Sequence, residues 1–233
     1  MLNDIELMAL HVNALFVHNA DERLVSINEP GGSTTAAPRL FLGRTRMGNI
    51  WRFHAELPEG IVSELEHLNS EDVWQAGDFD APHRYLGQLK ILETDQPVNT
   101  SQGLAYSFSE QSTPTGEIVE VTQANLDVLG AGFEELISEL GTWEPFLALL
   151  NKGRAVSVCR SSRITPDAHE AGVETLPDFR GRGLAVAVTA AWAVRVRSLG
   201  AIPLYSTSLD NKASQAVARK LRLRHYGNDI QIG

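Results

Sequence analysis

The segment 177–194, PDFRGRGLAVAVTAAWAV, constrains the fold of this chain most, because it joins a glycine-rich turn to a long helical pattern. From Gly183 to Leu199 there is no proline and no internal glycine, and Gly200 supplies the stop. Apolar residues recur at four-residue spacing and place one stripe on one helix face. They are Leu184, Val188, Trp192 and Val196. The pattern predicts a helix over 183–199 that is buried along this stripe.

Two arginines and two glycines stand where this helix begins. The first turn of a helix exposes unpaired backbone N–H groups and the positive end of the helix dipole, which together attract phosphates. Gly181 and Gly183 leave room for a phosphate to approach the backbone. The guanidinium groups of Arg180 and Arg182 suit phosphate oxygens. The junction therefore predicts an anion site, with an exposed tight turn as the alternative.

The formal net charge of −9 is divided unevenly along the chain. Residues 1–150 carry a net charge of −16, whereas residues 151–233 carry +7. A basic excess confined to one end favours an anion site, and the acidic remainder argues against nucleic-acid binding. A small polyanionic ligand fits this distribution, although docking of the basic part on the acidic part would explain it equally well.

Targeting and metal signals are missing from the sequence. No apolar run reaches the roughly 18 residues needed to span a membrane, and the acidic N-terminus does not resemble a secretion signal. Cys159 is the single cysteine, and the seven histidines show no metal-ligand spacing. These observations predict a cytoplasmic protein with no metal and no membrane contact.

The remaining pattern predicts an α/β chain in two parts, residues 1–115 and 116–233, with a turn-rich boundary near residue 115. In the first part we expect strands at 14–19, 23–28, 38–43, 49–55 and 104–110, and helices at 58–68 and 81–92. In the second part we expect strands at 117–122, 145–150, 154–160, 168–176, 202–208 and 224–233. Helices are expected there at 125–140, 183–199 and 211–223.

Two sequence blocks resemble the GNAT superfamily of N-acetyltransferases. The block VETLPDFRGRGLA, residues 173–185, resembles the acyl-CoA signature Arg/Gln-x-x-Gly-x-Gly/Ala, with Arg180, Gly183 and Ala185 in the defining positions. The block PLYSTSLDNKASQAVARKL places Asn211 and Ser214 as in the family's Asn-x-x-Ala/Ser segment. The resemblance covers the chain from residue 117 onward. It implies a GNAT fold with a mixed α+β sheet there, preceded by a smaller α/β domain.

The resemblance also implies an acetyl-CoA-dependent N-acetyltransferase in which the strands 168–176 and 202–208 splay apart around the pantetheine arm. By position, the residues that would contact acetyl-CoA are Val173, Glu174, Thr175, Phe179, Arg180, Gly181, Arg182, Gly183, Leu184, Ala185, Asn211 and Ser214. The acceptor would be a primary amine on a small molecule or a peptide, and the acidic N-terminal part favours a cationic one. The resemblance does not fix the oligomeric state, and a homodimer is one of the states that it allows.

Three residues are candidates for acid and base catalysis. Glu170 is the preferred base and Glu174 the alternative, because both stand on the strand beside the expected thioester, although either could be a solvent-facing strand residue. The family's tyrosine after the second block is replaced by Ala218, so Tyr205 is the candidate acid. Other groups that could supply the proton are Tyr226, Ser206 and His225. The thiolate could also leave unprotonated, since an ordinary thiol pKa of about 8.5 makes it a tolerable leaving group. The competing interpretation is a non-catalytic acyl-CoA-binding module that kept the cofactor site and lost the catalytic acid.

Overall fold

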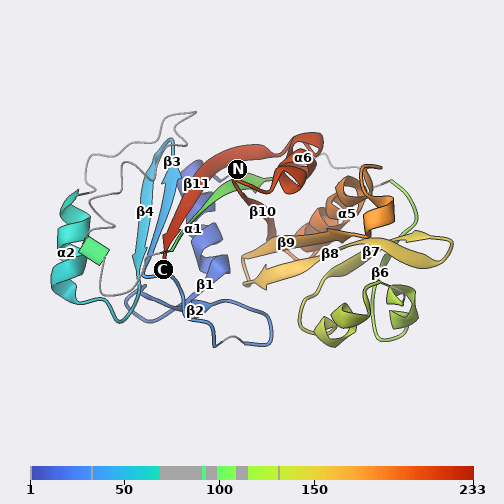
Figure 1. Cartoon of the computed structure of the whole chain (residues 1–233), viewed down its shortest axis with the longest axis horizontal. Helices are drawn as coiled ribbons and strands as arrows, with labels where there is room; N and C mark the ends of the chain where they lie inside the picture. The colour runs from blue at the N-terminus through green and yellow to red at the C-terminus, as the bar shows by residue number, and fades with distance from the viewer. Residues whose placement is uncertain (1, 33, 69–90, 93–98, 109–114, 131) are drawn as a thin grey trace. The chain divides into compact units, whose positions relative to one another are not determined.

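The computed structural model describes residues 2–32, 34–68, 91–92, 99–108, 115–130 and 132–233 (Figure 1). The chain folds into two compact units. The first comprises Met1–Ile27, Ser33–Ala105 and His225–Gly233, and the second comprises Asn28–Gly32 and Tyr106–Arg224. Each unit combines helices with β-strands, which confirms the predicted α/β class. The predicted domains, 1–115 and 116–233, stay a prediction.

The first unit is built around a group of strands that includes the C-terminal one. Its elements are α1 (Asp4–Leu15), β1 (Phe16–His18), β2 (Leu24–Ile27), β3 (Leu40–Thr45), β4 (Gly48–Phe53), α2 (Glu59–Leu68), most of β5 (Thr100–Ser107) and β11 (Arg224–Ile232). Strands β1 and β2 form an antiparallel ribbon. In this unit the sheet order is β4-β3-β11-β5, and β3 pairs antiparallel with both β4 and β11. The last strand of the chain is therefore an inner strand here.

Helix α1 was not predicted, although the sequence carries a start signal for it. The Asn3 side chain accepts the backbone N–H of Glu6 at 3.0 Å, and the Glu6 carboxylate accepts the backbone N–H of Asn3 at 2.8 Å. This reciprocal pair is a capping box, which satisfies two N–H groups at the helix start. The residues Asn-x-x-Glu would have located the beginning of the helix.

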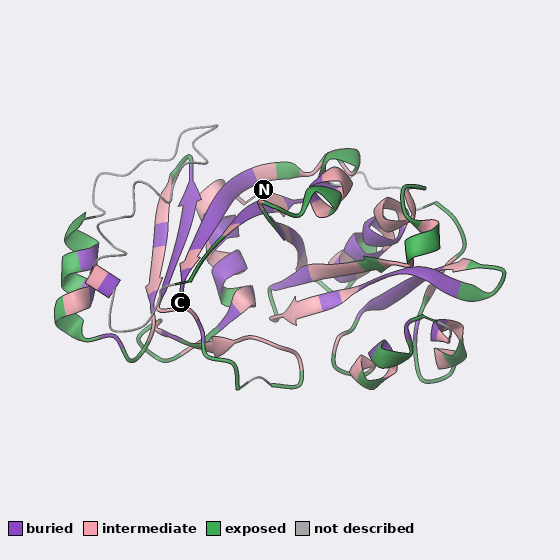
Figure 2. Cartoon of the chain, viewed as in Figure 1, coloured by how far each residue is buried: buried purple, intermediate pink, exposed green. Residues whose placement is uncertain are grey.

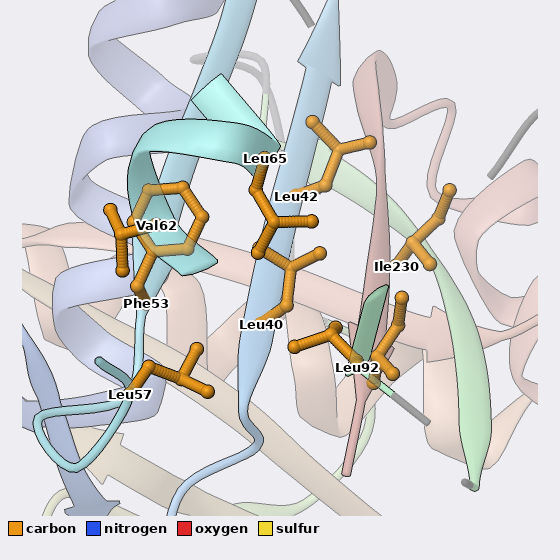
Figure 3. Packing of buried hydrophobic residues seen from close by; sticks show 9 residues of the cluster. Leu40, Leu42, Phe53, Leu57, Val62, Leu65, Leu92 and Ile230 are labelled. Carbon is orange, nitrogen blue, oxygen red and sulfur yellow. The ribbon is translucent and has the colours of Figure 1, made fainter. Parts of the chain in front are cut away.

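The apolar face of α2 closes a core over β3, β4 and β11 (Figure 3). Val62 and Leu65 of this helix are buried. The whole cluster comprises Leu40, Leu42, Phe53, Leu57, Val62, Leu65, Leu92, Ile230 and Ile232. Full burial of one such side chain contributes about 1.5–3 kcal/mol, so packing holds α2 in place. The predicted helix at 58–68 is confirmed, whereas most of the predicted helix at 81–92 lies outside the described residues.

The second unit contains a mixed sheet with the order β10-β9-β8-β7-β6. Its elements are β6 (Ile118–Glu120), η1 (Leu126–Leu129), η2 (Glu134–Glu139), β7 (Phe146–Asn151), β8 (Arg154–Ile164), β9 (Ala168–Thr175), η3 (Pro177–Phe179), α5 (Leu184–Ser198), β10 (Ile202–Ser208) and α6 (Lys212–Lys220). Strands β9 and β10 run parallel, and the other neighbouring pairs run antiparallel. This agrees with the predicted order of strands.

The prediction of one helix over 125–140 is wrong. Two short 3₁₀ helices, η1 and η2, occupy this segment, and Gly130 ends the first of them. Gly132 has φ 140°, far from the right-handed helical region, so the backbone cannot continue as an α-helix through it. The apolar residues that suggested a helix are still used for packing, since Leu129, Phe133 and Leu136 are buried.

The predicted stripe of α5 is buried against the second unit's sheet. Val188, Trp192 and Val196 are fully buried in one cluster, and Leu184 packs against it. The Trp192 indole N–H donates to Ser161 Oγ at 3.1 Å, and Ser161 Oγ lies 2.9 Å from His169 Nδ1. This buried chain of hydrogen bonds links α5 to β8 and β9.

The tip of the β7–β8 hairpin, in contrast to this core, is exposed (Figure 2).

Candidate active site

The parallel strands β9 and β10 are hydrogen-bonded at only one end. Their register pairs Ile202 with Ala168, Pro203 with His169 and Leu204 with Glu170, and it ends there. Both strands then continue, to Thr175 and to Ser208, without pairing with each other. The facing edges of the separated segments therefore leave backbone N–H and C=O groups able to pair with an extended ligand.

A cavity of about 820 Å³ opens at this separation. Both separated strand segments, the η3 turn, the start of α5 and one face of α6 line it. Among the residues predicted to contact acetyl-CoA, those that line the cavity are Val173, Glu174, Thr175, Phe179, Arg180, Gly181, Gly183, Leu184, Ala185, Asn211 and Ser214. Residues separated by up to 41 positions in the sequence, from Val173 to Ser214, thus surround one space.

Arg182 differs from the other predicted contacts, because it is not among the described residues that line the cavity. Its Nη2 donates to the backbone oxygen of Asp178 at 2.7 Å. Its guanidinium carbon lies 5.1 Å from the centre of the Phe179 ring. Arg180, in contrast, lines the cavity and donates from Nε to the backbone oxygen of Thr175 at 3.1 Å. The two arginines before the start of α5 therefore have different environments.

The start of α5 presents its backbone to the cavity. Gly183 is the N-cap residue with φ 82°, and Gly181 has φ 76°. Both are left-handed conformations that glycine adopts at little cost. A Cβ atom at either position would meet no protein atom within 4 Å, so the protein requires glycine here for its backbone angle rather than for space. No side chain caps the helix start, which leaves the first-turn N–H groups available to an anion.

Helix α6 and strand β10 are linked by a hydrogen-bonded tyrosine. The Asn211 side chain caps α6 by accepting the Ser214 backbone N–H at 3.0 Å. The Tyr205 hydroxyl lies 2.7 Å from Ser214 Oγ, and Tyr205 lines the cavity while being only 1% exposed. Burial raises the pKa of Tyr205 to about 12, against the opposing effect of the Ser214 hydrogen bond. The phenol is therefore protonated at neutral pH.

The two candidate carboxylates on β9 occupy different surroundings. The Glu174 side chain is 45% exposed, lines the cavity, and forms an ion pair with Arg160 at 2.7 Å between Oε1 and Nη1. Glu170 is 2% exposed and is not among the described residues that line the cavity. Its Oε2 accepts the Ser206 hydroxyl at 3.1 Å, and Ser206 does line the cavity. Glu170 is thus connected to the cavity through Ser206.

The buried thiol of Cys159 is unsuited to nucleophilic chemistry. Burial raises its pKa to about 12, while a hydrogen bond with Thr189 opposes this effect. A thiol that stays protonated at neutral pH is a poor nucleophile. Burial also lowers the pKa of His169, which keeps that imidazole neutral in the same core.

A family model described as GNAT acetyltransferase matches residues 146–227. Residues 146–227 therefore match a GNAT acetyltransferase domain. The matched segment begins with β7 and ends within β11, so it includes β9, α5, β10 and α6, the elements that line the cavity. A domain of this family indicates an acyltransferase. A comparison with curated proteins gives no match to this chain.

Solved structures share the fold of the GNAT domain. An acetyltransferase of the GNAT family from Colwellia psychrerythraea matches with a TM-score of 0.50 and 12% identity, covering 100% of this chain and 97% of that one. A GCN5-related N-acetyltransferase from Kribbella flavida matches with a TM-score of 0.50 and 14% identity, covering 100% and 95%. A GNAT-family protein from Novosphingobium aromaticivorans gives 0.45 and 17%, covering 58% of this chain and 66% of that one. At these identities the likeness concerns the fold alone.

Several residues that line the cavity were not among the predicted contacts. They are Gly132, Phe133, Ala171, Leu176, Pro177, Val186, Ser206, Thr207, Ser208, Ala213, Ala216, Val217 and Lys220, together with Tyr205, which was predicted only as an acid. The β10 residues among them come directly after the segment that pairs with β9. They line the cavity because they lie beyond the last strand pair, and this position is known only from the structure. Lys220 adds a second cation to the cavity, and its place in the last turn of α6 was the available signal.

Ser206 is the one remaining candidate for the acid among the described residues that line the cavity. Tyr226 and His225 belong to the first unit and are not among the described residues that line the cavity. Ala218, at the position of the family's tyrosine, is 1% exposed and does not line the cavity either.

Within the described ranges, no group of three or more His, Cys, Asp or Glu residues could hold a metal ion, and no helix is long and apolar enough to cross a membrane.

Proposed function

We propose that this chain is an acetyl-CoA-dependent N-acetyltransferase that transfers the acetyl group directly to a primary amine. The observation that carries the proposal is the separation of β9 from β10 beyond Leu204 and Glu170, which opens a cavity beside the start of α5. The GNAT acetyltransferase domain matched over residues 146–227 supports it. When bound, acetyl-CoA supplies the activated acetyl thioester.

The residues around the cavity fit such a donor. The unpaired edge of β9 from Val173 to Thr175 offers backbone groups to the amides of a pantetheine arm. The uncapped first turn of α5 and the Arg180 guanidinium suit a pyrophosphate. A β9 N–H near Val173 would polarise the acetyl carbonyl, where negative charge develops as the amine attacks.

The proposed reaction needs two proton transfers, and we assign one base and one acid to them. The amine must lose a proton to become a nucleophile, because an alkyl ammonium has an ordinary pKa of about 10.4. We assign this proton to Glu170 in preference to Glu174, whose carboxylate already pairs with Arg160. We assign Tyr205 as the acid that protonates the departing sulfur, since its raised pKa of about 12 keeps it protonated.

The acceptor in this proposal is a cationic primary amine, carried by a small molecule or a peptide. The acidic character of residues 1–150, with a net charge of −16, supports a cation over an acidic acceptor. This argument concerns the long-range field, so it selects a class of acceptor rather than a compound.

The test is acetyl transfer to a panel of polyamines, aminoglycosides, amino acids and peptides, followed as thiol release. We expect thiol release that depends on the acceptor. Arg180→Gln should weaken acetyl-CoA binding about tenfold, as loss of one charge-assisted contact does. Arg182→Gln should weaken it less, because that guanidinium is held at Asp178 and lies off the cavity. Unchanged affinity in the Arg180 variant would contradict the phosphate assignment.

A non-catalytic acyl-CoA-binding module is the second candidate. The observation in its favour is Ala218, a buried alanine where the family has its tyrosine. This candidate predicts acetyl-CoA binding, measured by calorimetry, with no thiol release on any acceptor. The presence of Tyr205 in the cavity wall favours the enzyme.

A further inference from the structure

We propose that Ser206 is a catalytic residue that carries the proton of the acceptor amine to Glu170. This inference rests on the proposed acetyltransferase function. Glu170 is 2% exposed and lies off the cavity wall, so it does not touch a ligand held there. The Ser206 hydroxyl lines the cavity and donates to Glu170 Oε2 at 3.1 Å. This hydroxyl therefore links the buried carboxylate to the cavity by a direct hydrogen bond.

The strand register explains why these two side chains meet. Leu204 pairs with Glu170 in the last parallel pair of β9 and β10. Ser206 follows Leu204 by two positions, so strand alternation returns it to the same face of the sheet. Tyr205 stands between them and points to the other face, where it meets Ser214. Ser206 and the candidate acid Tyr205 thus lie on opposite faces of β10, and both line the cavity.

The proton transfer through Ser206 balances without a further reactant. The Ser206 hydroxyl gives its proton to the Glu170 carboxylate as it receives one from the ammonium nitrogen of the acceptor. The amine becomes neutral and nucleophilic, the serine ends unchanged, and Glu170 becomes a carboxylic acid. No bond to the serine oxygen other than O–H forms or breaks.

Arg163 and Glu29 are positioning residues for this relay. Arg163 stands directly opposite Glu170 on β8, next to an irregularity in the pairing between Ser161 and Arg163. Its Nη2 lies 3.7 Å from Glu29 Oε1, and its Nη1 donates to the Ser162 backbone oxygen at 2.6 Å. Burial lowers the pKa of Arg163, and the charges of Glu29 and Glu170 oppose this effect. The guanidinium therefore pairs with Glu29, and Arg163 stands opposite Glu170 in the strand register.

The segment that supplies Glu29 belongs to the same compact unit as the cavity. Residues Asn28–Gly32 are grouped with Tyr106–Arg224. The Asn28 side-chain amide donates to the backbone oxygen of Ile164 at 3.0 Å, which anchors the segment on the end of β8. A short piece of the N-terminal half thus supplies a carboxylate to Arg163.

The test compares Ser206→Ala and Ser206→Thr in steady-state acetyl transfer. Loss of a proton relay should lower kcat about 100-fold, while the dissociation constant for acetyl-CoA stays within about twofold of the wild type. Threonine keeps the hydroxyl, so Ser206→Thr should retain most of kcat. Ser198→Ala, which removes an exposed hydroxyl on α5, is the matched control and should behave as the wild type.

Combining Ser206→Ala with Glu170→Gln tests whether the two act as one unit. If they do, the double variant should be no slower than the slower single variant. Arg163→Gln and Glu29→Gln should each lower kcat about tenfold at unchanged acetyl-CoA affinity, with Arg163→Lys restoring part of the loss. Arg195→Gln, which breaks an Arg–Glu pair with Glu120 elsewhere in the unit, should leave kcat unchanged.

The outcomes separate this inference from the proposed function. Turnover in the wild type with an undiminished kcat in Ser206→Ala overturns the relay alone. Additive losses in the double variant also overturn it, because they would show independent roles. Acetyl-CoA binding without turnover on any amine, in the wild type, overturns the proposed function and the relay with it.

Discussion

The strands β9 and β10 differ between their two ends, because they are hydrogen-bonded to each other at one end and separated at the other. At the closed end, Ala168–Glu170 and Ile202–Leu204 are hydrogen-bonded to each other and almost entirely buried. At the open end, Ala171–Thr175 and Tyr205–Ser208 separate and contribute to the cavity wall. The closed end keeps a carboxylate out of water, and the open end offers backbone groups to a ligand. The point where the pairing ends therefore separates the buried Glu170 carboxylate from the backbone groups that line the cavity.

Each end has its own support. The closed end rests on the buried chain of Trp192, Ser161 and His169, which ties β9 to β8 and α5. The open end rests on Tyr205 and Ser214, which tie β10 to α6. We therefore expect a substitution at the closed end to affect a different property of the protein from a substitution at the open end.

The largest expected contrast is between the carboxylates of the two ends. Glu170→Gln at the closed end should lower kcat about 100-fold, because it removes the proton acceptor. Glu174→Gln at the open end should lower kcat by less than about threefold, since its carboxylate is engaged by Arg160 in an exposed pair. Steady-state acetyl transfer measures both. A larger loss for Glu174→Gln would reverse the assignment of the base.

The next effect concerns the support of the closed end. Ser161→Ala leaves the Trp192 indole N–H and the His169 ring nitrogen without the serine oxygen, deep in the core. Removing one partner of buried polar groups costs about 1–3 kcal/mol. Urea denaturation should show this loss, while Ser198→Ala at the surface should change the free energy of unfolding by less than about 0.5 kcal/mol. Equal effects of the two variants would contradict the role of the buried chain.

The smallest effect is a pH dependence at the open end. The pKa of Tyr205 is raised from 10.0 to about 12 by burial, so the unfolded chain loses this proton first as the pH rises. The free energy of unfolding should therefore fall between about pH 10 and pH 12, by at most about 1.4 kcal/mol per pH unit for one group. Tyr205→Phe should flatten this slope.

The matched measurement for that slope is urea denaturation of the wild type and Tyr205→Phe at the same alkaline pH values. Cys159, whose pKa is raised from 9.0 to about 12, also contributes a slope in both proteins, so only the difference between their slopes reports on Tyr205. Identical slopes in the two proteins would show that Tyr205 is not buried as the structure has it.

Local patterns predicted much of the fold. The α5 stripe, the strands at 145–150 and 154–160, and the strand–helix–strand order around the site depend on residues close together in the sequence, and these predictions are confirmed. The segment 125–140 failed because its apolar spacing is also compatible with two 3₁₀ turns, and Gly130 and Gly132 interrupt it. There, backbone conformation outweighed periodicity.

The candidate site was predicted less evenly. The glycines and Arg180 stand where the motif places them, because a helix start and its preceding turn form locally. Arg182 has the same local context but turns to Asp178 and Phe179. Glu170 and Glu174 share one strand, yet only contacts with β8 and β10 make one buried and the other exposed.

By itself, the sequence determined the α/β class, the glycine-to-helix junction and the residues that gather there, because short-range periodicity and backbone preferences produce them. The tertiary structure alone decided where β9 and β10 stop pairing, which carboxylate is buried and accepts the Ser206 hydroxyl, and that Glu29 pairs with Arg163. These features depend on strand register, burial and charge between residues that are distant in the sequence, and no local pattern contains them.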